Sequence, residues 1–231
     1  MKNKQSALII FLLIQLYLYS MLVCFSSYFN PRILLIISSL LCVIMTGFLF
    51  CKTKDYYIML IAISLSFISD LFIENMPVVS FFLLNITQIL YLCRTLLDSE
   101  NKTFNITTRL VAIPICIFIG FMLLQERMDI LSILWIIYTV NLFINILFAI
   151  KEIGLNNFFP IGLLGLFIYS SLTMFLALEN YTIINVPFIN SLANISFNIS
   201  LAFYIPAQII LTCSVFTVNR RCFSKIKNEE N

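Results

Sequence analysis

Apolar runs long enough to cross a membrane are the feature of this sequence that most limits its fold. A hydrocarbon core about 30 Å thick needs about 20 helical residues, and runs of this order recur along the chain with short polar breaks between them. The sequence therefore predicts an all-α, polytopic membrane protein built as a bundle of eight transmembrane helices. The predicted spans are residues 7–23, 33–50, 56–73, 78–97, 110–125, 130–150, 158–178 and 192–217.

The composition agrees with lipid as the solvent. Of the 231 residues, 61% are hydrophobic and 11% are charged, whereas a soluble domain is about 25% charged. Too little polar surface is available to cover a water-soluble globule. We therefore expect residues 1–218 to form one transmembrane domain, and residues 219–231 to form a basic cytoplasmic tail.

The basic residues predict the orientation of the bundle. With the N-terminus inside, all of the 14 lysines and arginines except Arg32 and Arg127 fall in segments predicted to be cytoplasmic. This one-sided distribution is what the positive-inside rule describes. We expect both termini to be cytoplasmic, in an integral protein of a bacterial inner membrane.

Metal, haem and nucleic-acid sites are disfavoured by the residue types present. The chain has no histidine, and its seven cysteines include no C-x-x-C pair. We expect no metal and no cofactor. The basic tail is typical of an anchor near anionic lipid rather than of a nucleic-acid-binding segment, so the expected partner is membrane lipid.

Asp70 is the only carboxylate within a predicted apolar span. Placing a charged residue at the centre of a membrane helix costs about 2.5–3.5 kcal/mol on insertion scales, so such residues usually serve a function. The alternative is a structural role, in which the side chain reaches the interface or forms an ion pair. Arg32 is the only basic residue predicted at a similar depth, and we expect the two side chains to pair.

Other polar residues recur at three- or four-residue spacing, which puts them on one face of each predicted helix. Their depths predict a polar pocket that opens toward the outer leaflet. The alternative is that they form hydrogen bonds between helices, which contribute roughly 0.6 kcal/mol each. The residues expected to line the pocket are Arg32, Ser66, Asn85, Tyr138, Asn141, Ser170, Tyr204 and Gln208.

Four short segments share a pattern with a known membrane family. They are Leu65-Ser66-Phe67-Ile68-Ser69-Asp70-Leu71, Phe82-Leu83-Leu84-Asn85-Ile86-Thr87-Gln88-Ile89-Leu90-Tyr91, Gly165-Leu166-Phe167-Ile168-Tyr169-Ser170-Ser171 and Tyr204-Ile205-Pro206-Ala207-Gln208. The family has apolar-Ser-x-x-Gly-Asp in its third helix, Phe-then-His-x-x-Tyr in its fourth, Gly-then-Phe-x-x-Ser-Asp in its seventh and Tyr-x-x-x-Gln in its eighth. The chain thus resembles the YhhN-like lysoplasmalogenase family, eight-helix proteins that include vinyl-ether lysolipid hydrolases.

The resemblance implies a catalytic group with Asp70 as the acid or base and with Gln88, Tyr91 and Ser171 beside it. Gln88 stands where the family has histidine, and Ser171 stands where it has a second aspartate. Vinyl-ether hydrolysis needs proton donation to carbon and activation of water, which suits two titrating groups. This chain offers one such group within the membrane.

The leading hypothesis is a divergent YhhN-like protein that binds lysolipids in an intramembrane pocket and hydrolyses their vinyl-ether bond through Asp70. One alternative is a homologue that binds lipid without catalysis. Another is a small transporter, which would want more ionisable groups at the midplane and glycine-broken helices.

Overall fold

The computed structural model describes residues 2–25, 30–49, 53–99, 101–125, 128–154, 157–180 and 202–215. Within these ranges the regular structure is helical, with no strand. The labelled helices are α1 (Lys2–Phe25), α2 (Pro31–Phe48), α3 (Lys54–Phe72), α4 (Pro77–Asp98), α5 (Lys102–Leu124), α6 (Ile130–Ile153) and α7 (Phe158–Asn180). A further apolar helix covers Ala202–Val215.

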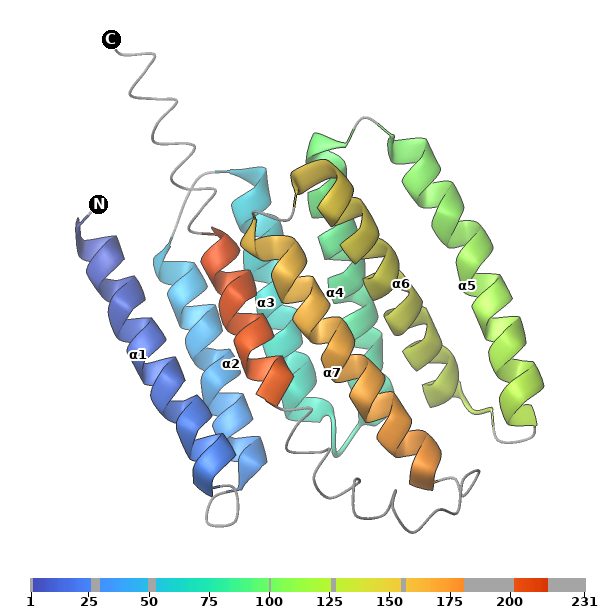
Figure 1. The fold of residues 1–231 in the computed structure, drawn as a ribbon, viewed down its shortest axis with the longest axis horizontal. Coiled ribbons are helices and arrows are strands. Elements are labelled where there is room, and N and C mark those ends of the chain that lie inside the picture. The colour runs from blue at the N-terminus through green and yellow to red at the C-terminus, as the bar shows by residue number, and fades with distance from the viewer. Residues whose placement is uncertain are drawn as a thin grey trace.

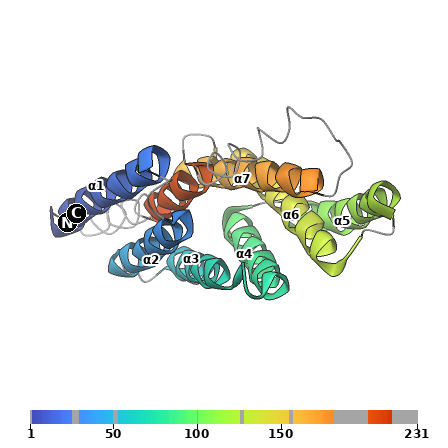
Figure 2. The same cartoon turned by 90° about the horizontal axis from the view of Figure 1, so that it is seen from below.

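The helices form two rows, and helices that follow one another in the chain run roughly antiparallel (Figure 1). Seen from below, α2, α3 and α4 make one row, and the Ala202–Val215 helix and α7 lie across it in the other (Figure 2). α1 and α5 lie at opposite edges, where α1 packs on α2 and α5 packs on α6. Most of the surface of α5 is therefore left to face lipid.

Among the described residues, six helices, α1 to α6, are long and apolar enough to cross a membrane. The prediction of an all-α chain is confirmed for the described residues, and a multi-helix membrane protein is what these lengths support. The count of eight spans and the cytoplasmic placement of the termini stay predictions. Residues 192–201 and 216–217 of the last predicted span, and the predicted tail 219–231, lie outside the described residues.

The helix that contains the fifth predicted span begins before that span. The apolar run predicts a span at 110–125, whereas α5 begins at Lys102. The physical reason is that Arg109 and Asn105, one turn apart, are buried against α6. The Arg109 guanidinium donates to Asn141 and Asn145 of α6, so its polar side chain needs no water.

Side-chain caps fix where several helices begin. The Asn30 side chain accepts a hydrogen bond from the backbone N–H of Arg32 at 3.0 Å, and Thr53 caps α3 in the same way. Asp129 caps α6 by accepting from the hydroxyl and the backbone N–H of Ser132. These two bonds hold the pKa of the Asp129 carboxyl below its usual range. Each cap satisfies a backbone donor that the first helical turn leaves open.

Close packing of α7 on the Ala202–Val215 helix depends on glycine. A Cβ at Gly165 would lie 2.9 Å from the Cβ of Ala207, which is fixed to the backbone and cannot rotate away. Small residues at such contacts let two membrane helices approach closely. Gly47 of α2 offers a matched position, because a Cβ there meets nothing within 4 Å.

Replacing Gly165 by Leu is expected to destabilise the protein by about 1–3 kcal/mol, because the added side chain forces the two helices apart. Gly47→Leu should change stability by less than about 0.5 kcal/mol, as surface substitutions do. Thermal unfolding of both variants in detergent measures the difference. Equal unfolding temperatures would contradict the close approach of the two helices.

Candidate functional site

A cavity of about 300 Å³ opens near the end of the bundle where α2 begins and α3 ends. This end is called the Arg32 end below, and it is the predicted outer side. Among the described residues that line the cavity, the charged side chains are those of Arg32, Asp70 and Glu74. The complete lining is Arg32, Leu35, Asp70, Ile73, Glu74, Phe81, Leu84, Leu131, Trp135, Tyr138, Tyr169, Ser170, Thr173 and Tyr204.

Asp70 and Tyr204 meet at the wall of this cavity. The Tyr204 hydroxyl lies 2.7 Å from each carboxylate oxygen of Asp70, although the two residues are 134 positions apart. Asp70 is 6% exposed and Tyr204 is 4% exposed. The ring of Tyr169 packs on that of Tyr204 at 4.8 Å between centroids. Asp70 therefore faces the bundle interior rather than lipid.

The expected pair between Arg32 and Asp70 is not the one that forms. Arg32 makes its ion pair with Glu74, and its Nη2 donates to the backbone carbonyl of Leu71 at 3.3 Å. Glu74 follows the end of α3 and lies about one turn closer to the surface, within reach of the first turn of α2. The Asp70 carboxylate instead accepts a hydrogen bond from the phenol of Tyr204.

Ser170 also lines the cavity, in a group of neutral partners. Its hydroxyl oxygen accepts from the Trp135 indole at 3.3 Å and shares a hydrogen bond with Thr139 at 3.1 Å. A serine nucleophile needs a base within hydrogen-bond reach. Both of these recorded partners are non-basic, so the geometry favours Ser170 as a wall residue.

An aromatic wall completes the cavity. Tyr138 meets the edge of the Phe81 ring at 6.4 Å, and Trp135 packs on the same ring at 5.6 Å. Phe81 and Trp135 were not among the predicted site residues. The three rings lie on α4 and α6, which pack against each other beside the cavity. Aromatic side chains offer a ligand a large apolar contact area together with a few polar groups, which is the usual lining of a ligand pocket.

Gln88 and Asn141, both predicted at the site, belong to a separate polar network. The side-chain amide of Asn145 donates to the side-chain oxygen of Gln88 at 3.0 Å. Arg109 donates to the side-chain oxygens of Asn141 at 2.8 Å and of Asn145 at 2.9 Å. These contacts join α4, α5 and α6. The network thus supports the reading of polar stripes as interhelical hydrogen bonds.

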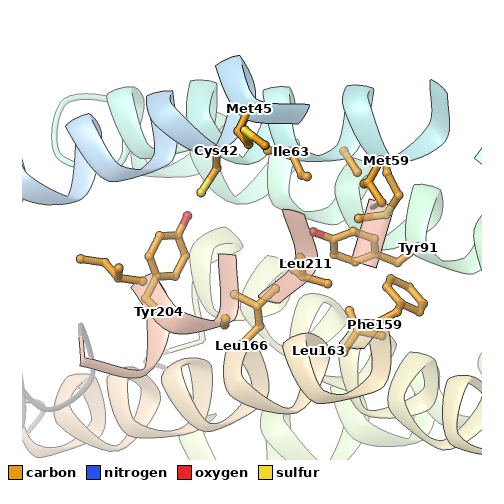
Figure 3. Packing of buried hydrophobic residues seen from close by; sticks show 14 of the residues in the cluster. Cys42, Met45, Met59, Ile63, Tyr91, Phe159, Leu163, Leu166, Tyr204 and Leu211 are labelled. Atoms are coloured by element: carbon orange, nitrogen blue, oxygen red, sulfur yellow. The ribbon is translucent and has the colours of Figure 1, made fainter. Parts of the chain in front are cut away.

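Tyr91 also lies away from the cavity. It is fully buried and packs edge-on against Phe159 at 5.7 Å. Figure 3 shows Tyr91 and Tyr204 on either side of Leu211, within the apolar interior. Four other predicted residues do not line the cavity either: Ser66, Asn85, Ser171 and Gln208. The cavity therefore gathers Arg32, Asp70, Tyr138, Ser170 and Tyr204 from the predicted set.

A buried ion pair at the opposite end of the bundle was missed by sequence reasoning. Arg94 Nε lies 2.6 Å from the Asp55 carboxylate, and its Nη1 donates to the Ser214 hydroxyl at 2.8 Å. The guanidinium also lies 4.2 Å from the centroid of the Phe159 ring. This cluster ties α3, α4, α7 and the Ala202–Val215 helix together. Its sequence signal is an arginine inside the apolar run 78–97.

The described residues offer few groups of side chains that could bind a metal ion. Among the residues that the structure describes, no three His, Cys, Asp or Glu side chains gather in one place. Asp70 and Glu74 are the acidic residues that line the cavity, and the Glu74 carboxylate forms an ion pair with Arg32. The cavity offers acid–base chemistry by a carboxylate rather than a ligand set for a metal ion.

Comparison of the chain with protein-family models, with curated proteins and with solved structures finds no match. The YhhN-like resemblance therefore stays a prediction based on short motifs.

Proposed function

We propose that the cavity binds a lysolipid of the vinyl-ether type and that Asp70 hydrolyses its vinyl-ether bond. The observation that carries this proposal is the Asp70 carboxylate, buried at the cavity wall and held by the Tyr204 hydroxyl. The resemblance to the YhhN-like family favours the same substrate class. On this proposal the chain is a divergent member of that family.

The character of the cavity fits an amphiphile. Its walls are mainly aliphatic and aromatic, while Arg32 and Glu74 stand at the Arg32 end. A molecule with an apolar chain and a charged head matches this division. In the orientation predicted from the basic residues, the ligand would enter from the outer leaflet of a bacterial inner membrane.

One carboxylate can complete the reaction by acting twice. In its protonated form, Asp70 gives its proton to the vinyl-ether carbon that is not bonded to oxygen, which leaves an oxocarbenium ion. Water then adds to the oxygen-bearing carbon, and the Asp70 carboxylate takes the proton that this water loses. The resulting hemiacetal separates into a fatty aldehyde and a glycerol alcohol. The reaction consumes one water and needs no oxidant. Because Asp70 both gives and takes back the proton, the missing histidine and second aspartate do not prevent it.

Tyr204 would hold the Asp70 carboxyl in place between these two steps. A phenol that donates to the carboxylate stabilises its ionised form and fixes its orientation. Packing of Tyr204 on Tyr169 keeps the phenol itself in position. Tyr204 is thus a positioning residue for Asp70 in this mechanism.

Filling the cavity should abolish both binding and turnover. Leu131 lines the cavity, whereas its neighbour Ile130 is 62% exposed and serves as the matched control. We expect Leu131→Trp to remove the thermal stabilisation that a saturated-ether lysolipid gives the wild type, about 2.7 kcal/mol at one hundred times Kd. The same variant should lower aldehyde release from a vinyl-ether lysolipid at least about tenfold, as expected when the site is blocked.

Ile130→Trp should keep both properties. If Leu131→Trp keeps them as well, the cavity is not the binding site. Stabilisation of the wild type without aldehyde release would overturn the hydrolytic part of the proposal and favour the non-catalytic lipid-binding alternative.

A further inference from the structure

The Arg32–Glu74 ion pair stands at the mouth of the cavity. Both residues line it, and their side chains are 25% and 60% exposed. Arg32 is anchored toward the interior, because its Nη2 donates to the Leu71 carbonyl. The Arg32 Nε is buried and makes no hydrogen bond within the described residues. The pair therefore combines an oriented cation that has a spare donor with an exposed carboxylate.

Such a pair can exchange partners with a ligand that carries both charges. A guanidinium can donate two parallel hydrogen bonds to the oxygens of one phosphate group. A single contact with a carboxylate leaves some of these donors without an acceptor. The Glu74 carboxylate, once released, would lie beside the ammonium group of the same headgroup. One ion pair would then become two, with no charge left unmatched.

We propose that Arg32 and Glu74 form the headgroup site, in which Arg32 binds the phosphodiester and Glu74 binds a cationic group attached to it. The inference rests on the proposed function, since it assumes that the ligand is a lysolipid. It adds a specificity: zwitterionic lysolipids bind in preference to anionic lysolipids of the same chain length.

The spacing within the cavity agrees with this placement. Glu74 follows Asp70 by four residues, which is about 6 Å along the helix direction. In a glycerol lysolipid, an ester oxygen and three carbons separate the phosphorus from the ether oxygen at the first carbon, roughly 6 Å at ordinary bond lengths. A phosphate on Arg32 would thus bring the vinyl ether to the level of Asp70.

An anionic headgroup lacks the second partner. Its phosphate can bind Arg32, but the Glu74 carboxylate then lies beside a negatively charged ligand that offers it no cationic group. Like charges held this close repel each other. Discrimination therefore depends on the sign of the charge at position 74.

Binding of two saturated-ether lysolipids, one with a phosphocholine head and one with a phosphoglycerol head, tests the proposal. The full chain in detergent micelles is titrated with each, and the affinities are compared. We expect the wild type to bind the phosphocholine lipid at least tenfold more tightly, and Glu74→Lys to reverse the preference. Asn75→Lys places the same charge on the adjacent exposed residue, which is absent from the cavity wall, and should keep the wild-type preference.

Equal affinities in the wild type, or the same ratio in Glu74→Lys and Asn75→Lys, would overturn the assignment. The saturated-ether probes cannot be hydrolysed, so this result is independent of turnover. Loss of the preference while Asp70-dependent aldehyde release persists would refute the headgroup site alone. A preserved preference without aldehyde release would support the headgroup site and refute the hydrolysis.

Discussion

Replacing Asp70 by Asn is expected to lower the rate of vinyl-ether hydrolysis by about 10²–10⁴-fold, the usual contribution of a positioned acid or base. Asn has nearly the shape of Asp, but it can neither give a proton to the vinyl-ether carbon nor accept one from water. The Tyr204 hydroxyl, 2.7 Å from both carboxylate oxygens, can still donate to the amide oxygen. The loss should therefore appear in turnover, with lysolipid binding retained.

Two measurements keep this prediction informative. Thermal unfolding in detergent should show that Asp70→Asn is folded, since it replaces a buried ionisable group by a neutral one of similar volume. Asp70→Glu restores the carboxyl but displaces it by one methylene, so it should recover part of the rate. A rate in Asp70→Asn equal to that of the wild type would exclude Asp70 as the acid.

Replacing Asp55 by Asn is expected to destabilise the protein by about 3–5 kcal/mol, because it leaves the Arg94 cation buried without its counterion. The Arg94 side chain is 4% exposed and that of Asp55 is 18% exposed. Ser214 and the Phe159 ring contact Arg94 as well, but neither carries a charge. Thermal unfolding in detergent measures the loss.

The double variant Asp55→Asn/Arg94→Met should be more stable than Asp55→Asn alone, because it removes the buried charge of Arg94 together with that of Asp55. The exposed Arg32–Glu74 pair supplies the control: Glu74→Gln should cost no more than about 1 kcal/mol. If Asp55→Asn and Glu74→Gln have the same small effect, the buried pair does not hold the four helices together.

The helices were predictable because bilayer thickness sets their length. Apolar runs of about 20 residues predict α1 to α4 and α6 to within a few residues at most ends. The start of α5 was not predictable in this way. Arg109 and Asn105 read as loop residues in the sequence, and only the fold supplies the asparagines of α6 that bury them.

The candidate site was predictable in part. Asp70 stood out as a lone acid in an apolar run, and the Tyr204 motif pointed to the same site through the family resemblance. Helical spacing places residues on one face, but it does not say which neighbouring helix that face meets. Gln88 therefore bonds to Asn145 rather than reaching Asp70.

The partner of Arg32 illustrates the same limit. The predicted depths placed Arg32 and Asp70 at a similar level in the membrane. Arg32 nevertheless forms its ion pair with Glu74, which lies one turn beyond Asp70. The aromatic wall was missed because Phe81 and Trp135 are indistinguishable by type from lipid-facing aromatic residues. Their roles depend on the packing of α4 against α6 beside the cavity.

Hydrolysis of a vinyl-ether lysolipid in D₂O, with mass analysis of the released aldehyde, links the site to its chemistry in one experiment. If Asp70 protonates the vinyl-ether carbon, the wild type will release a fatty aldehyde that carries one deuterium on the carbon next to the carbonyl. Asp70→Asn will release little or none in the same time. No aldehyde from the wild type, or equal amounts from the wild type and Asp70→Asn, would contradict hydrolysis by Asp70 in this cavity.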